Sequence, residues 1–145
     1  MKRFLATLQR RRWFALGLLS GLMGTAQAQE PDSRWQLRVF DLHNLVKVEA
    51  TIRFTNEPAQ SCMGGAWKRV IVEARDAQAE SFFPLSEPLT YSLEGNRLTL
   101  GRTRVCDAYL FLSGPAGRSM ITGSYDAVGW GRRQLGSFVL GKIQN

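Results

Sequence analysis

Apolar and polar residues alternate with a period of two through much of this chain. The longest alternation lies within residues 45–55, where apolar side chains at even positions are separated by Lys, Glu, Thr and Arg. The apolar positions are Val46, Val48, Ala50, Ile52 and Phe54. A β-strand with one buried and one solvated face produces this pattern. We therefore predict a long, half-buried strand over residues 45–55.

Shorter segments of the same kind recur along the chain. We predict further strands over residues 35–42, 67–74, 105–114, 119–126 and 135–143, and a hairpin over residues 89–101. In that hairpin, Gly95-Asn96 supplies the positive φ that a two-residue turn requires. His43-Asn44 forms a tight connection between the first two strands. Residues 70–80 are the only stretch compatible with a helical turn.

Many short strands separated by glycine- and proline-containing turns are typical of antiparallel barrels and sandwiches. We predict a single-domain, all-β fold in which an antiparallel meander of about eight strands closes into a small barrel of lipocalin- or avidin-like architecture. Closure is favoured because it removes exposed strand edges. Gly123, Gly136 and Gly141 lie inside predicted strands and suit tightly curved walls. A β-sandwich is the alternative.

One short segment adds to this expectation. Residues 121–131, ITGSYDAVGWG, resemble the TG-x-Y…G strand-and-turn rhythm of avidin-type barrels. The resemblance covers about a dozen residues and implies a barrel. No further part of the avidin pattern recurs along the chain, so the resemblance assigns no ligand-binding residue.

The first 28 residues contain the three parts of a secretory signal peptide. A basic segment precedes a short apolar run at residues 13–24, and Ala26-Gln27-Ala28 then forms the pattern of a cleavage site. The apolar run is shorter than the roughly 20 residues of a membrane-spanning helix. We predict cleavage after Ala28 and export of a single domain, residues 29–145, to the periplasm or the extracellular medium. We expect no stable membrane insertion after cleavage.

This assignment changes the meaning of the charge. The formal net charge is +7, but five of the 19 basic residues precede residue 29, which leaves 14 basic and 12 acidic residues, a net of +2. A strongly basic domain would indicate nucleic-acid binding. The nearly balanced exported domain lacks that indication, so we expect no nucleic-acid partner.

Cys62 and Cys106 are the only two cysteines of the chain. In an exported protein an even number of cysteines indicates disulfide pairing, so we predict a Cys62–Cys106 bridge rather than a nucleophilic thiol. His43 is the only histidine, and its DLHN context places it in a turn. A Ser-His-Asp or Cys-His constellation would have to use it, and zinc sites usually need more ligands than remain. We therefore expect no enzymatic activity, no cofactor and no metal.

Large aromatic residues occur in nearly every predicted strand, and they either fill the barrel or line its mouth. The turn over residues 129–136 also combines an aromatic residue with two arginines. The candidate contact residues are Trp67, Trp130, Arg132, Arg133, Tyr125 and His43. We expect a small binding protein of the cell envelope that recognises a protein partner, such as an enzyme inhibitor or immunity protein. The alternative is a lipocalin-like carrier of a small apolar ligand, which requires a hollow interior.

Overall fold

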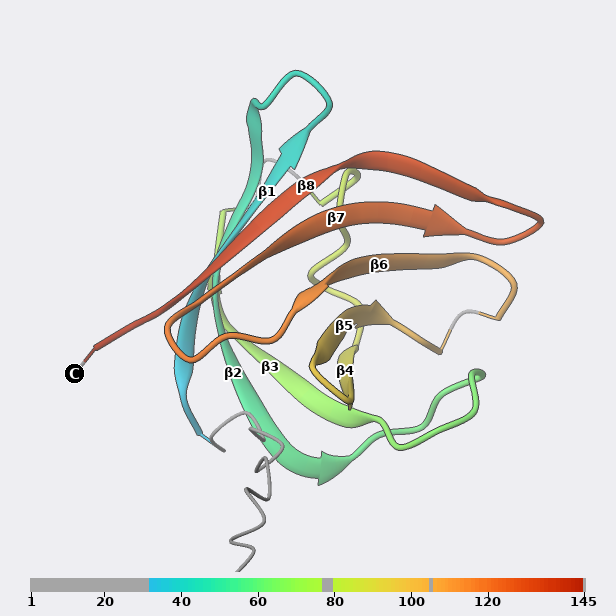
Figure 1. Cartoon of the computed structure of the whole chain (residues 1–145), viewed down its shortest axis with the longest axis horizontal. Coiled ribbons are helices and arrows are strands. Elements are labelled where there is room, and N and C mark those ends of the chain that lie inside the picture. The colour runs from blue at the N-terminus through green and yellow to red at the C-terminus, as the bar shows by residue number, and fades with distance from the viewer. Residues whose placement is uncertain (1–31, 77–79, 105, 145) are drawn as a thin grey trace, which may run out of the picture.

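The computed structural model describes residues 32–76, 80–104 and 106–144 (Figure 1). The predicted signal peptide lies outside these residues. The strands are β1 (Arg34–Asp41), β2 (Val46–Pro58), β3 (Lys68–Arg75), β4 (Leu89–Glu94), β5 (Arg97–Arg102), β6 (Tyr109–Pro115), β7 (Met120–Val128) and β8 (Arg132–Lys142). Each strand pairs antiparallel with the next, and β8 pairs with β1. The predicted eight-stranded meander is therefore confirmed, and it closes as a barrel.

The alternation in β2 predicts the interior correctly at four of five positions. Val48, Ala50, Ile52 and Phe54 are buried. Val46 is 46% exposed because Val39 pairs with Val48 but the next residue, Phe40, pairs with Val46, so Lys47 is an extra residue that turns Val46 outward. The β1–β2 hairpin beyond this point projects from the barrel wall (Figure 1). The β4–β5 hairpin also forms as predicted, and Gly95 at its turn has a φ of +57°.

The strand predicted over residues 105–114 begins later than expected. β6 starts at Tyr109, and Cys106 lies in the exposed connection before it instead of on an inward strand face. The reason is local, since Asp107 has a φ of +68°, which a β-strand cannot contain. Of the stretch over residues 70–80 that is compatible with a helical turn, residues 70–75 belong to β3, and residues 77–79 lie outside the described residues.

Side chains from the strands fill much of the barrel interior. Trp35 contacts Phe54 edge to face, with ring centroids 5.9 Å apart, and Phe54 contacts Tyr91 at 4.8 Å. The Tyr91 hydroxyl donates a 2.8 Å hydrogen bond to the carbonyl oxygen of Thr55. This hydroxyl therefore keeps a partner inside the apolar core, as buried tyrosines require.

The connection from β3 to β4 contributes side chains to the barrel interior. Phe83 and Leu85 from this connection belong to the buried core. The rings of Phe82 and Phe83 contact Tyr125 edge to face, at 5.2 and 5.5 Å. The Tyr125 hydroxyl donates a hydrogen bond to the carbonyl oxygen of Phe82. We call residues 80–88 the inner cap, because they supply core side chains without being part of the wall.

Polar contacts fix the inner cap to the strands. Glu80 accepts hydrogen bonds from the hydroxyl and the backbone N–H of Ser86, and these bonds hold the pKa of Glu80 below its ordinary value. Arg75 pairs with Glu80 at 3.3 Å, and Arg102 donates to both carboxylate oxygens of Glu87 at 2.9 Å. The cap is thus tied to both β3 and β5.

Replacing Phe83 by Ala tests the role of the inner cap. A fully buried Phe reduced to Ala loses its transfer free energy and leaves a cavity, so we expect the free energy of unfolding to fall by about 3–5 kcal/mol. Urea denaturation monitored by circular dichroism measures the change. Leu42→Ala, at a position that is 64% exposed, is the control and should shift stability by less than about 0.5 kcal/mol. Equal effects of the two substitutions would contradict the assignment.

Candidate functional site: a groove beside a stapled flap

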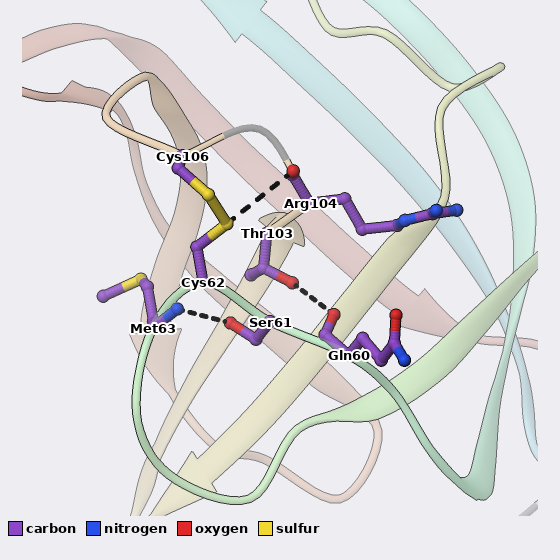
Figure 2. Close-up of a disulfide and its surroundings, with 7 residues drawn as sticks. All are labelled: Gln60, Ser61, Cys62, Met63, Thr103, Arg104 and Cys106. Carbon is purple, nitrogen blue, oxygen red and sulfur yellow. Dashed lines mark hydrogen bonds between the residues drawn. A yellow bond between two sulfur atoms is a disulfide. The ribbon is translucent and has the colours of Figure 1, made fainter.

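Residues 59–67, which connect β2 and β3, fold back across the outside of β4 and β5. We call this segment the flap. The backbone N–H of Cys62 donates to the carbonyl oxygen of Thr103 at 2.9 Å, and the Thr103 hydroxyl donates to the carbonyl oxygen of Gln60 at 3.4 Å. Figure 2 shows these residues together with the Cys62–Cys106 disulfide, which joins the flap to the β5–β6 connection. The predicted disulfide is confirmed.

The flap explains why outward-facing hydroxyl groups of the barrel are buried. Thr90 and Thr103 point away from the interior, on the opposite face from Leu89 and Leu100, yet both are almost inaccessible to solvent. Their hydroxyls share a 2.9 Å hydrogen bond, and Thr90 also donates to the carbonyl oxygen of Gly101. Buried polar groups need such partners. The barrel therefore carries a second, polar layer under the flap.

Trp67 closes the flap against an aromatic stack on the outer surface. Its ring lies parallel to that of Phe111 at 6.1 Å, and Phe111 stacks on Tyr109 at 5.4 Å. Phe111 covers Gly101 on the neighbouring strand, where an added Cβ would lie 2.8 Å from the Phe111 ring. Trp67 is buried, but it faces this outer layer and not the barrel core.

A groove of about 320 Å³ lies between the flap and the β7–β8 hairpin. Its floor consists of hydroxyl side chains from β4, β5 and β6, its flap wall of Trp67 and Met63, and its opposite wall of β7 and β8. The polar lining residues on the floor and the opposite wall are Ser92, Thr99, Ser113, Asp126 and Arg132. Glu94 and Arg97 line it at the β4–β5 turn. The groove thus combines an aromatic wall with charged groups of both signs.

The best-defined polar contact in the groove joins Asp126 and Arg132. Asp126 is only 3% exposed, and its Oδ2 accepts hydrogen bonds from Arg132 Nη2 at 2.8 Å and Ser124 Oγ at 2.6 Å. Burial raises the pKa of Asp126, but these hydrogen bonds and the charges of Arg132 and Arg97 outweigh it and hold the pKa below its ordinary value. Asp126 is therefore a charged carboxylate that accepts two hydrogen bonds at Oδ2.

A register shift in the β7–β8 hairpin makes this contact possible. Tyr125 pairs with Gly136, but the next residue, Asp126, pairs with Gln134, so Leu135 is an extra residue in β8. A strict alternation would place Arg132 on the same face as the buried Phe138 of β8. The bulge reverses the alternation and turns Arg132 outward, beside Asp126. The sequence contains Asp126 as one of many carboxylates, and only this register pairs it with Arg132.

The predicted contact residues do not form a single site in the structure. Arg132 and Trp67 both line the groove. Trp130 is fully exposed at the tip of the β7–β8 hairpin, and Arg133 is exposed next to it. Tyr125 lies in the core, where its hydroxyl is bonded to the inner cap, so it is not part of a surface site. His43 is exposed on the β1–β2 hairpin, whose tip diverges from that of β7–β8 in Figure 1 although both hairpins leave the same end of the barrel.

Asp126, Arg97 and Ser113 are groove residues that the sequence alone does not single out. Within the described residues, no cluster of three or more His, Cys, Asp or Glu side chains is arranged to hold a metal ion. The same residues contain no helix that is long and apolar enough to span a membrane.

Comparison with protein families, with curated proteins and with solved structures finds no significant match to this chain. The class of protein is thus given by the structure alone. It is an eight-stranded antiparallel β-barrel whose outer flap is attached by a disulfide. A structural disulfide is typical of proteins that fold outside the cytoplasm.

Asp126→Asn tests the electrostatic contact in the groove. Because the pKa of Asp126 is lowered by folding, the carboxylate stabilises the protein above its ordinary pKa of 3.8, and this contribution is lost as the pH falls through the lower folded value. We expect the variant to lose roughly 1.5–3 kcal/mol at pH 7, and the difference from the wild type to shrink below about pH 4. Urea unfolding between pH 3 and 8 measures both.

The control for this experiment is Glu49→Gln, which removes the exposed ion pair between Glu49 and Arg38. An exposed pair of this kind contributes about 0–1 kcal/mol. A pH-independent effect of Asp126→Asn would show that the charge of Asp126 is not what stabilises the fold.

The double substitution Cys62→Ser, Cys106→Ser tests the role of the disulfide, which we call the staple. The two cysteines are 44 residues apart, and the chain-entropy model gives a loss of about 4 kcal/mol for a loop of this length. Urea unfolding measures the loss, and hydrogen exchange at the Trp67 indole reports whether the flap still covers Phe111. The wild type in reducing agent should match the variant. A stable variant with unchanged Trp67 protection would mean that the flap holds without its staple.

Proposed function

We propose that this protein is an exported, non-catalytic binding protein that attaches to a protein partner in the cell envelope, as an enzyme inhibitor or immunity protein does. The observation that carries this proposal is Trp130. It is fully exposed at the tip of a structured hairpin, between Gly129 and Gly131. The partner-binding surface consists of this tip and the adjoining groove, because Arg132 belongs to both.

The composition and rigidity of the tip support a protein partner. Trp and Arg are among the residues that most often dominate protein–protein binding energy. β7 and β8 pair along nine positions up to Val128 and Arg132, and Asp126 fixes the Arg132 side chain. A preorganised tip of this kind loses little conformational entropy on binding.

Features elsewhere in the chain support export and the absence of catalysis. The disulfide and the signal-peptide pattern of residues 1–28 agree with an oxidising compartment. His43 lies on an exposed turn and both cysteines are bonded to each other, so a Cys-His pair does not form. The groove lining therefore contains neither a histidine nor a free cysteine thiol.

The interior favours a protein partner over an apolar cargo. A carrier encloses most of its ligand in a cavity. Here strand residues such as Trp35 and Phe54 occupy the barrel together with Phe83 of the inner cap, and all three are fully buried. The groove between the flap and the β7–β8 hairpin lies outside the wall.

Trp130→Ala tests the proposal. Because the side chain contacts solvent only, we expect a stability change within about 0.5 kcal/mol, whereas retention of an envelope protein in a pull-down should fall at least about tenfold. Quantitative mass spectrometry of proteins captured from envelope extract measures retention. Leu42→Ala, at the exposed tip of the other hairpin, is the matched control and should retain the partner. A partner held equally by all three proteins would contradict the role of Trp130.

A further inference from the structure

Charge is unevenly distributed between the two halves of the barrel. Residues 32–88 contain seven basic and eight acidic side chains, whereas residues 89–144 contain seven basic and three acidic ones. The second half, β4 to β8, therefore has an excess of four positive charges, although the exported domain as a whole is nearly neutral. This half includes the groove and the Trp130 tip.

The two halves also differ in how many of their basic side chains have a partner within the molecule. In the first half, six of the seven basic side chains form ion pairs with carboxylates, and Lys68 donates to Asn56. In the second half, Arg102 and Arg132 are paired. Arg97, Arg104 and Arg133 form no hydrogen bond or ion pair through their side chains among the residues that the structure describes. Positive charge without an internal partner is thus concentrated on one side of the molecule.

Arg97 brings this excess into the groove. Arg97 lines the groove together with Arg132, which pairs with Asp126, and the positive charge of Arg97 also contributes to the lowered pKa of Asp126. Arg132 contacts Asp126 and Ser124 through Nη2 alone, which leaves its other donors unused. A guanidinium group has five N–H donors and binds a carboxylate through two of them at once. The β7–β8 side of the groove can therefore accept a second carboxylate.

Glu94 is the acidic residue of the groove lining besides Asp126, and its side chain forms no ion pair among the residues that the structure describes. Its Oε1 approaches Gly65 of the flap, where an added Cβ would be 3.6 Å away. Glu94 thus faces the flap. The walls formed by Trp67 and Phe111 reduce solvent access on the flap side, and partial exclusion of water strengthens a charge-assisted hydrogen bond.

We propose that the groove receives an Asp or Glu side chain from an acidic segment of the protein partner, and that Arg97 and Arg132 bind its carboxylate. This inference rests on the proposed function and specifies the chemistry of the partner. Arg133, exposed next to Arg132 on the β7–β8 hairpin, adds positive charge beside this side of the groove. Trp130 anchors the partner at the tip while the groove selects for its charge.

The probe for this site is a fluorescent, N-acetylated and C-amidated hexaglutamate peptide, with hexaglutamine as the neutral control. Fluorescence anisotropy at low ionic strength should show binding of hexaglutamate alone. We expect Arg97→Gln to weaken it about tenfold and Glu94→Gln to strengthen it, because the first removes an attractive charge and the second a repulsive one. In proton–nitrogen NMR spectra, the Trp67 indole signal should shift on binding while that of Trp130 stays in place.

The matched control is Arg38→Gln, which changes the net charge equally but lies on β1, outside the groove. Equal weakening by Arg38→Gln and Arg97→Gln would overturn the proposal, since it would indicate attraction to the net charge alone. Absence of hexaglutamate binding would also overturn it. Stronger, Arg97-dependent binding of inorganic phosphate or of phosphatidylglycerol vesicles would assign the groove to a phosphate group instead.

The peptide experiment is separable from the test of Trp130. Trp130→Ala should bind hexaglutamate normally, because Trp130 does not line the groove. If Trp130→Ala loses the envelope partner and Arg97→Gln keeps it, protein binding stands and the carboxylate site is wrong. If hexaglutamate binds through Arg97 but no partner depends on Trp130, the carboxylate-binding site is supported and the proposed Trp130 interface is wrong.

Discussion

The Cys62–Cys106 disulfide is the constraint on which the outer surface of this barrel depends. It joins the flap to the β5–β6 connection and so holds a nine-residue segment, residues 59–67, across the outside of two strands. Without a covering segment, Thr90 and Thr103 would be ordinary solvated positions on the polar face of a sheet. With it, they form a buried hydrogen-bonded layer, and Trp67 becomes the wall of a groove.

Connections, as much as strands, give this small barrel its layers. The inner cap places Phe83 and Leu85 inside the wall, and the flap places Trp67 against its outside. The flap precedes β3 and the inner cap follows it. The pairing of β3 with β4 is the shortest in the barrel, since only Lys68, Arg69 and Val70 pair with β4. This short β3–β4 pairing is therefore covered on the inside of the barrel by the inner cap and flanked on the outside by the flap.

The sequence predicts the wall better than these covering segments, for a physical reason. Alternation in residues 45–55 identifies β2, because a half-buried strand must repeat every two residues. The cysteine pairing follows from a count of two in a chain with an export signal. Phe82 and Phe83 carry no such period, and only closure of the barrel determines that their segment turns inward. Trp67 is likewise apolar and next to a strand, yet its partner, Phe111, lies 44 positions away and becomes adjacent only when the flap folds back.

The β-bulge at Leu135 links the core to the groove through two consecutive residues of β7. Tyr125 points inward and bonds the inner cap, whereas Asp126 points outward and bonds Arg132. Because the bulge sets the register of both contacts, the hairpin cannot shift by one residue without exchanging the faces of its side chains. A slip would pull Tyr125 from the cap and would direct Arg132 toward the interior, where an unpaired charge is costly. The packing of the core thus fixes the orientation of Arg132, and with it the geometry of the groove and of the Trp130 tip.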